Sequence, residues 1–336
     1  MNKLSILLLL TLNLSSSTMN EISFEHDGVS RSYLMYVPDN ISLDNENDLV
    51  IGLHGYTGTA SGFEKETTGG FNVTADKYGF IVIYPQGSFF NKNLFKHSFI
   101  SSWNDLVGSK NATPEGEICS IEAEIAPKYP ECKNSPRCSW TSCSDDIGFI
   151  KKIIDKTKKD NNIRNIYLLG MSNGGMMAQA MACKHPELFK AVVNIVGMQH
   201  KGGSCVPDKP VNFIIYGGIK DTVVPPVNIE SYAGYFYEPM NNTFNLWSEK
   251  FNCLKFHDDK YLYFDGFVQK TAFDCKNNVK IYSILNMDRG HLWPGISSNV
   301  GYCASSAQSN INYLKCKKSN INQWGNDFLM EILLSL

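Results

Sequence analysis

The stretch NIYLLGMSNGG, residues 165–175, decides the fold class. It begins as a short apolar run and continues with Gly170, Ser172 and Gly174 in a GxSxG pattern. In this pattern a strand ends in a sharp turn that lifts the serine hydroxyl above a sheet, and a helix follows. The stretch therefore predicts Ser172 as a nucleophile. The alternative is an ordinary glycine-rich turn.

Similar apolar runs recur on both sides of this stretch, bounded by Gly, Pro and Asn. They cover residues 32–37, 49–53, 80–84, 165–169, 191–196, 211–216 and 279–285. Most are continuously apolar, which is typical of strands buried on both faces of a parallel sheet. Helices are expected at 146–158, capped by Ser144 or Asp145, and at 174–185. The sequence thus predicts an α/β fold with a mostly parallel, doubly wound sheet.

One region interrupts this alternation. Residues 88–143 are polar, rich in cysteine and too long for an ordinary connection between elements. We expect an insertion held by local disulfides that forms one wall of the active site. Residues 324–336 place their apolar side chains on one helical face, which favours a docked final helix. The prediction is a single catalytic domain over residues 19–336.

The chain begins with Lys3 and an apolar run from Leu4 to Leu12, followed by small polar residues. This pattern indicates a cleaved signal peptide at 1–18, because the run is too short to span a bilayer. We therefore expect a secreted protein. Acceptor sequons at Asn40, Asn72, Asn111 and Asn241 would suit a glycoprotein in a eukaryotic host.

The ten cysteines, an even number, favour disulfides in an oxidising compartment. They are Cys119, Cys132, Cys138, Cys143, Cys183, Cys205, Cys253, Cys275, Cys303 and Cys316. A zinc site among the first four is the alternative, but their spacing contains no CxxC pair. We expect neither a metal nor a cofactor. The net charge of -2, with no long block of either sign, argues against nucleic acid or anionic membranes as partners.

A serine hydroxyl needs a base, normally a histidine that is held by a carboxylate. In the order Ser, acid, His, the base must follow Ser172. His291 comes a few residues after an apolar run and is predicted to lie at the carboxyl edge of the sheet. His200 and His257 are expected to be surface residues. Asp221 follows the run VNFIIYGG and is the predicted acid, while a turn-capping role is its alternative.

Two backbone amides should bind the oxyanion that forms during acyl transfer. The first is the amide of Asn173, directly after the nucleophile. The second should come from HGYTG, residues 54–58, with the amide of Tyr56 or Gly55 as donor. His54 is expected to be a structural histidine.

Several motifs together resemble one family: HGYTG (54–58), Trp103 with Asn104, SDDIGFI (144–150), GMSNGG (170–175), DTVVP (221–225) and GHLWPG (290–295). They are similar to the secreted esterases grouped with polyhydroxybutyrate depolymerases, feruloyl esterases and acetylxylan esterases, of the α/β-hydrolase fold. The likeness runs from about Ser30 to beyond Pro294. It implies the same triad, and the disulfides Cys183–Cys205 and Cys253–Cys275.

The chain also departs from the family pattern. Tyr216, Pro226, Asp288 and Arg289 stand where the family often has other residues, which bears on the choice of substrate. Trp103 and Trp293 are assigned to substrate binding, with the buried core as the alternative.

The resemblance implies a serine esterase acting on feruloyl or acetyl esters of plant cell-wall polysaccharide, or on a hydroxyalkanoate polyester. A serine peptidase and a non-catalytic binding protein of the same fold are the alternatives.

Overall fold

The structure, a computed structural model, describes residues 18–66, 70–93, 98–261, 266–295 and 324–336. The strands are β1 (Thr18–His26), β2 (Val29–Val37), β3 (Asn47–Leu53), β4 (Phe80–Pro85), β5 (Ser88–Asn93), β6 (Ser98–Ser102), β7 (Ala112–Thr113), β8 (Gly116–Glu117), β9 (Ile163–Met171), β10 (Ala191–Ile195), β11 (Asn212–Gly218), β12 (Lys255–Tyr261), β13 (Phe267–Phe273) and β14 (Ile281–Asn286). The helices are α1 (Ala60–Glu66), α2 (Gly70–Tyr78), α3 (Asp146–Asp160), α4 (Asn173–Lys184), α5 (Met240–Lys250) and α7 (Trp324–Leu334), with short 3-10 turns η1 (Pro186–Leu188) and η2 (Lys276–Asn278). None of the helices in these ranges is long and apolar enough to cross a bilayer.

The main sheet has ten strands in the order β1-β2-β4-β3-β9-β10-β11-β14-β13-β12. The six strands from β4 to β14 in this order run parallel, and antiparallel strands flank them on both sides. All residues of β3, β4, β10 and β11 are buried, as the continuous apolar runs predict. The predicted α/β class with a mostly parallel sheet is therefore confirmed.

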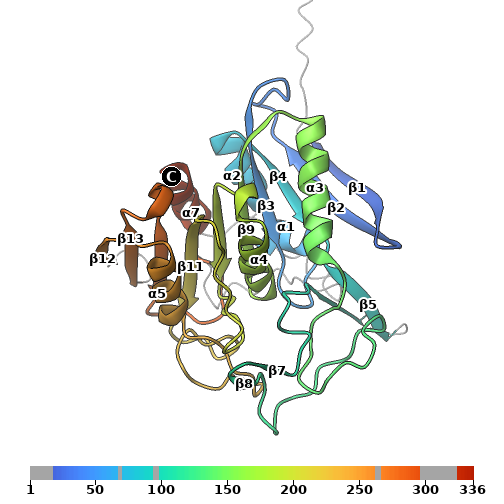
Figure 1. Cartoon of the computed structure of the whole chain (residues 1–336). Helices are drawn as coiled ribbons and strands as arrows, with labels where there is room; N and C mark the ends of the chain where they lie inside the picture. The colour runs from blue at the N-terminus through green and yellow to red at the C-terminus, as the bar shows by residue number, and fades with distance from the viewer. Residues whose placement is uncertain (1–17, 67–69, 94–97, 262–265, 296–323) are drawn as a thin grey trace, which may run out of the picture.

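Two hydrophobic cores lie on the two faces of this sheet. One contains side chains of α3, α4 and α5, including Phe149, Met177 and Trp247. The other contains side chains of α1, α2 and α7, including Phe63 and Leu333 (Figure 1). Helices on both faces are what a doubly wound parallel sheet requires, because each face must be kept from water.

Disulfides hold the insertion at 88–143 and two sites outside it. Cys119–Cys138 and Cys132–Cys143 lie inside the insertion, while Cys183–Cys205 and Cys253–Cys275 match the pairs that the resemblance implies. The remaining cysteines, Cys303 and Cys316, lie outside the described residues, as does the predicted signal peptide except for Thr18. A zinc site at the first four cysteines is excluded because their sulfurs are bonded in pairs.

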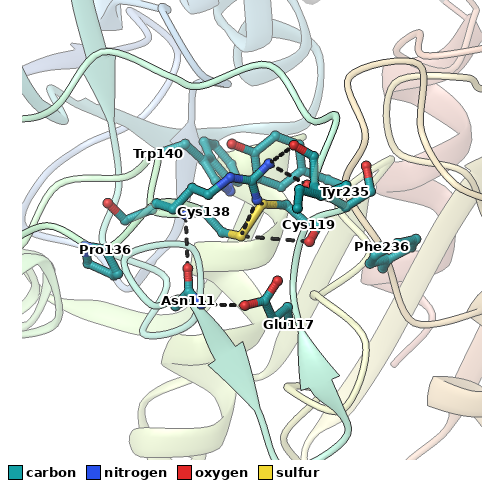
Figure 2. The surroundings of a disulfide bond; sticks show 12 residues. Asn111, Glu117, Cys119, Pro136, Cys138, Trp140, Tyr235 and Phe236 are labelled. Carbon is teal, nitrogen blue, oxygen red and sulfur yellow. Dashed lines mark hydrogen bonds between the residues drawn. A yellow bond between two sulfur atoms is a disulfide. The ribbon is translucent and has the colours of Figure 1, made fainter.

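Figure 2 shows how the Cys119–Cys138 disulfide is surrounded. Arg137 donates from Nη2 to the carbonyl oxygens of Ser120 and Ile121, at 2.6 and 2.5 Å, and its Nη1 lies 2.9 Å from the sulfur of Cys119. The segment around Cys119 has little regular secondary structure, and these contacts hold it in place. In Figure 1 the short strands β7 and β8 of the insertion lie beyond the lower end of the main sheet.

Candidate active site

Ser172 occupies the turn between β9 and α4. Its φ and ψ angles are 57° and -125°, a positive φ that is uncommon for a residue with a side chain. Its amide donates to the carbonyl of Ile195 on β10 at 2.8 Å, which ties the turn to the next strand. Such a conformation persists only where the surrounding structure enforces it, and it frequently marks a functional site.

Two glycines make this turn possible. A Cβ atom at Gly170 would collide with the carbonyl oxygen of Gly174, and one at Gly174 would collide with the carbonyl oxygen of Leu53 on β3. Because both neighbours are backbone atoms, they cannot move aside as a flexible side chain could. The GxSxG spacing is therefore dictated by packing around Ser172.

Asp221 and His291 meet at the same edge of the sheet. They follow the parallel strands β11 and β14, whose carboxyl ends lie side by side. Nδ1 of His291 is 2.7 Å from Oδ2 of Asp221. The other carboxylate oxygen, Oδ1, accepts the amides of Val223 and Val224 at 2.8 and 2.9 Å. The carboxylate is thus buried, oriented and paired with the imidazole.

Backbone bonds fix the loops that carry this pair. The amide of Lys220 donates to the carbonyl of Arg289 at 3.0 Å, and the amide of Ile219 donates to the carbonyl of Asn286 at 2.9 Å. These two bonds tie the loop after β14 to the loop after β11. This coupling keeps His291 beside Asp221 although 70 residues separate them in sequence.

A cavity of about 320 Å³ opens beside Ser172. Its lining is mainly aromatic and apolar: Tyr56, Ile100, Glu124, Ala126, Pro127, Trp140, Ser172, Val223, Val224, Tyr232, Ala233, Tyr235 and Tyr237. The insertion forms one wall of this cavity through Ile100, Glu124, Ala126, Pro127 and Trp140. Val223 and Val224, which also line the cavity, come two and three residues after Asp221.

The turn that holds Gly55 and Tyr56 packs directly against Ser172. A Cβ atom at Gly55 would lie 3.3 Å from Cβ of Ser172. His54, which precedes this turn, is fully buried: its Nδ1 lies 2.8 Å from the Gly55 carbonyl, and its Nε2 accepts the amide of Gly87 at 2.9 Å. Burial lowers the pKa of His54 to about 4, so the imidazole is neutral with its proton on Nδ1. His54 therefore supports the turn as a structural histidine.

Asn173 supports the same region from the start of α4. Its side-chain Oδ1 accepts the amide of Trp103 at 2.7 Å, and its Nδ2 donates to the carbonyl of Trp103 at 3.1 Å. Nε1 of Trp103 in turn donates to the carbonyl of His54 at 2.8 Å. The two backbone amides expected to bind an oxyanion thus lie on segments that these hydrogen bonds join.

The substrate-binding assignment of Trp103 and Trp293 does not fit their positions. Trp103 is completely buried, and Trp293 packs between Phe63 and Phe71 while donating to Oδ1 of Asn326 at 2.8 Å. Neither indole lines the cavity beside Ser172 in the described part of the chain. Both side chains belong to the core, Trp103 in the cluster on one face of the sheet and Trp293 in the cluster on the other.

His200 also differs from its prediction, whereas His257 is a surface residue as expected. His200 is fully buried, stacks on Tyr237 with the ring centroids 4.8 Å apart, and accepts a hydrogen bond from Nε1 of Trp140 at 2.8 Å. Burial lowers its pKa to about 4, which keeps it neutral as an acceptor. Its partners come from distant segments, so no local pattern marks it.

Sequence reasoning also missed the aromatic lining. Trp140, Tyr235 and Tyr237 reach the cavity from the insertion and from the loops that follow Asp221. The only sequence signal was the local density of Trp, Tyr and Cys, which does not show which rings share a cavity.

These features define a class: an α/β-hydrolase fold with a serine on the strand–turn–helix corner and a His–Asp pair at the same sheet edge. A model described as "alpha/beta hydrolase fold" matches residues 125–212, and a model described as "Esterase PHB depolymerase" matches residues 31–126. The resemblance to the esterase family is therefore confirmed by two models that cover successive parts of the chain.

Among curated relatives, an acetylxylan esterase of Coprinopsis cinerea is 29% identical over 173 residues, covering 50% of this chain and 35% of the relative. Feruloyl esterase B of Neurospora crassa is 26% identical over 207 residues, covering 60% and 57% of the two chains. The match thus spans only about a third to just over half of these relatives. Among solved structures, an acetyl xylan esterase from Aspergillus awamori superposes with a TM-score of 0.54 at 15% identity, covering 89% of this chain and all of that one, which shows the shared fold.

Proposed function

We propose that this protein is a serine esterase that hydrolyses carboxylic esters, with Ser172 as nucleophile, His291 as base and Asp221 as acid. The observation that carries the proposal is the positive φ of Ser172, whose side chain belongs to the lining of an aromatic cavity. The His291–Asp221 pair at the same edge of the sheet is the supporting observation. A strained serine and an oriented imidazole at the same edge of the sheet suit acyl transfer.

The reaction proceeds in two halves. Oγ of Ser172 attacks the ester carbonyl while His291 takes its proton, and the carboxylate of Asp221 stabilises the imidazolium through Nδ1. The amides of Asn173 and Tyr56 bind the oxyanion, with the amide of Gly55 as the alternative second donor. His291 then protonates the leaving alcohol. In the second half, His291 takes a proton from a water molecule that attacks the acyl enzyme. It then returns this proton to Oγ of Ser172 as the carboxylic acid leaves.

The cavity bears on which esters fit. Burial raises the pKa of the Tyr56 and Tyr235 phenols, so both hydroxyls stay neutral and the lining suits an uncharged, flat or small group. Such a lining is compatible with the acyl groups in the names of the relatives, acetyl and feruloyl. We therefore propose esters of plant cell-wall polysaccharide as the substrate class and a hydroxyalkanoate polyester as the second candidate.

The decisive experiment measures hydrolysis of p-nitrophenyl acetate, methyl ferulate, acetylated xylan and a hydroxybutyrate oligomer. Wild type is compared with Ser172→Ala and with Ser61→Ala, an exposed serine on α1 that serves as the matched control. We expect ester hydrolysis to fall by about a thousandfold or more in Ser172→Ala and to persist in Ser61→Ala. Equal cleavage of a peptide anilide would favour a peptidase, and binding without turnover in wild type would favour a binding protein.

Secretion is part of the proposal. The predicted signal peptide, the disulfides and the sequons support an extracellular site of action. Amino-terminal sequencing of protein recovered from the culture medium should begin near residue 19. Recovery of the protein only inside the cell, with Met1 retained, would overturn it.

A further inference from the structure

A short segment at the end of β6, residues 101–104, contacts both parts of the predicted oxyanion site. The carbonyl of Ser101 accepts the amide of Thr57 at 2.7 Å, and Thr57 belongs to the turn of the HGYTG motif. The amide and the carbonyl of Trp103 both bond to the side chain of Asn173. This bridging segment therefore joins the turn of the HGYTG motif to the residue that follows the nucleophile.

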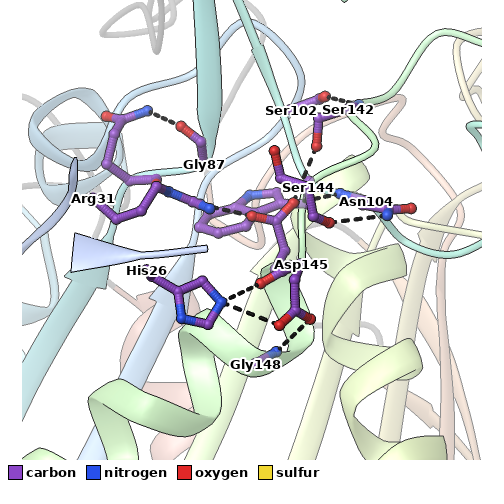
Figure 3. A network of polar contacts seen from close by, with 12 residues as sticks. His26, Arg31, Gly87, Ser102, Asn104, Ser142, Ser144, Asp145 and Gly148 are labelled. Carbon is purple, nitrogen blue, oxygen red and sulfur yellow. Dashed lines mark hydrogen bonds and ion pairs between the residues drawn. The ribbon is translucent and has the colours of Figure 1, made fainter. Parts of the chain in front are cut away.

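Asp146, in the first turn of α3, holds the bridging segment through a buried carboxylate. Its Oδ2 accepts the amide of Asn104 at 2.7 Å and the hydroxyl of Ser142 at 3.2 Å. Its Oδ1 accepts Nη2 of Arg31 at 2.6 Å. The side chains of Arg31 and Asp146 are 6% and 0% exposed. Figure 3 shows this network, which runs from Arg31 on β2 to Asn104 after β6.

Two further hydrogen bonds tie the bridging segment to the entry of α3. The amide of Ser142 donates to Oγ of Ser102 at 2.8 Å, and Nδ2 of Asn104 donates to the carbonyl of Ser144 at 3.0 Å. The SDDIGFI motif and the Trp–Asn pair, which are far apart in the sequence, thus meet in one network. Neither motif supplies a member of the triad.

A carboxylate suits the position of Asp146 because it only accepts hydrogen bonds. Three donors surround it, from Arg31, Asn104 and Ser142. An amide side chain in its place would turn its own NH₂ group toward one of these donors. A buried ion pair is often no more stabilising than apolar residues of similar size, so stability alone does not account for the pair.

We propose that Asp146 is a positioning residue for the oxyanion site. The inference rests on the proposed function, because it assigns Asp146 to the same reaction. Asp146 acts through Asn104: it fixes the bridging segment, which in turn holds the side chain of Asn173 and the turn that contains Tyr56. An oxyanion donor must lie about 2.7 to 3.1 Å from the oxygen that it stabilises. Loosening the bridging segment should therefore slow the chemical step more than it weakens substrate binding.

Kinetics of Asp146→Asn test this assignment. We expect kcat for p-nitrophenyl acetate to fall by about tenfold to a hundredfold, with KM changed by less than about twofold. Benzeneboronic acid forms a tetrahedral adduct with a nucleophilic serine and resembles the transition state, so its inhibition constant should rise by the same factor as kcat falls. A purely structural role would lower stability without this parallel change.

Asp48→Asn is the matched control. Asp48 is also buried, at 7% exposure, and it accepts three hydrogen bonds from Arg164 and Asn165. It lies near the amino ends of β3 and β9, whereas Ser172 follows the carboxyl end of β9. This variant should lose stability while kcat and the inhibition constant of the folded protein stay at the wild-type values.

Hydrogen exchange gives a readout that does not depend on catalysis. The amides of Thr57, Trp103 and Asn104 are all held by the contacts described above, so they should exchange about tenfold faster in Asp146→Asn and at the wild-type rate in Asp48→Asn. Arg31→Lys keeps the positive charge but loses the guanidinium geometry. It provides a milder test, with a fall in kcat of about threefold to tenfold, if Asp146→Asn does not fold.

The outcomes separate this inference from the proposed function. Wild-type exchange at these amides, or wild-type kcat and inhibition in a folded Asp146→Asn protein, would overturn the positioning role. Ester hydrolysis at the wild-type rate in Ser172→Ala would instead overturn the proposed catalytic serine. The exchange rates would still decide whether Asp146 holds the bridging segment.

Discussion

The parallel centre of the sheet and the disulfide-rich insertion position their side chains by different means. On the sheet, Ser172, Asp221 and His291 follow the parallel strands β9, β11 and β14, so the strand order brings them to one edge, where bonds between the loops hold the last two together. In the insertion, Trp140 is positioned by a hydrogen bond to His200 and by nearby disulfides. The sheet fixes groups suited to chemistry, and the insertion shapes the space that a substrate would fill.

The two regions also meet in a shared wall. The amide of Ser120 donates to the carbonyl of Gly234 at 2.8 Å, and the amide of Phe236 donates to the carbonyl of Ile118 at 3.0 Å. The segment around Cys119 is thus hydrogen-bonded along the loop that follows Asp221. A change in the insertion should therefore alter substrate fit without moving the carboxylate of Asp221. A change at the sheet edge should move that carboxylate without altering substrate fit.

The largest expected effect is on the sheet side. Asp221→Asn keeps the shape of the side chain but cannot stabilise an imidazolium, so we expect kcat for p-nitrophenyl acetate to fall by about a thousandfold to ten-thousandfold. Steady-state kinetics measure the rate, and circular dichroism checks the fold. Asp288→Asn changes an exposed carboxylate in the neighbouring loop and should retain the wild-type rate. A similar loss in both variants would contradict the role of Asp221.

Removing one disulfide from each region compares them directly. Cys119 and Cys138 are 19 residues apart, and Cys253 and Cys275 are 22 apart, so replacing either pair with serine should lower the free energy of unfolding by about 3 kcal/mol. Urea unfolding measures this. Only the first pair should also raise KM for esters, because it holds the wall beside Trp140. Equal effects on KM would show that the insertion does not shape the site.

The sequence predicted the sheet well because buried parallel strands are continuously apolar. Each of the seven predicted runs overlaps one strand from β2 to β14, with bounds that differ by at most two residues at the run's ends in 191–196, 211–216 and 279–285, and Ser172 was marked by the strand before it and the helix after it. The edge strands β1 and β12, and β13 next to β12, were missed, because a strand such as KFHDDKY carries the charges that protect a sheet edge and lacks the apolar pattern of a buried strand. Asp145, one of the two expected caps, accepts the amide of Gly148 at the start of α3.

The insertion could be recognised as a region but not folded from its pattern. Trp140 and His200 are 60 residues apart, and neither lies in a periodic segment. Their contact depends on disulfides and on buried hydrogen bonds between distant loops, which leave no local signature. For the same reason the sequence could not decide whether Trp103 and Trp293 bind substrate or belong to the hydrophobic core.

A smaller effect concerns Asp105, a buried carboxylate in the insertion. Its Oδ1 accepts the amide of Gly108 at 2.7 Å, but its Oδ2 has no hydrogen-bond partner among the described residues. Burial raises the pKa of Asp105 from 3.8 to about 6. Between these values the folded protein binds more protons than the unfolded chain, so this group's contribution to stability falls as pH rises through about 4 to 6.

Asp105→Asn removes that dependence while keeping the Oδ1 acceptor. At pH 7.5 the variant should be more stable than wild type by up to about 3 kcal/mol, and below pH 4 the difference should be close to zero. Chemical denaturation of both proteins at each pH measures it. Asp208→Asn, at a side chain 99% exposed, should show no such trend. A gain that does not depend on pH would rule out titration of Asp105 as its cause.

The smallest effect tests how the insertion holds its aromatic wall. Trp140→Phe keeps an aromatic ring in the cavity but removes the donor to Nε2 of His200, which is then left buried without a partner. We expect a loss of about 1 to 2 kcal/mol in stability and a severalfold rise in KM, with kcat nearly unchanged. The double variant with His200→Phe should recover part of the stability, because both polar partners are then gone. A fall in kcat at constant KM would mean that Trp140 acts on the sheet-edge residues, and the division between the two regions would then fail.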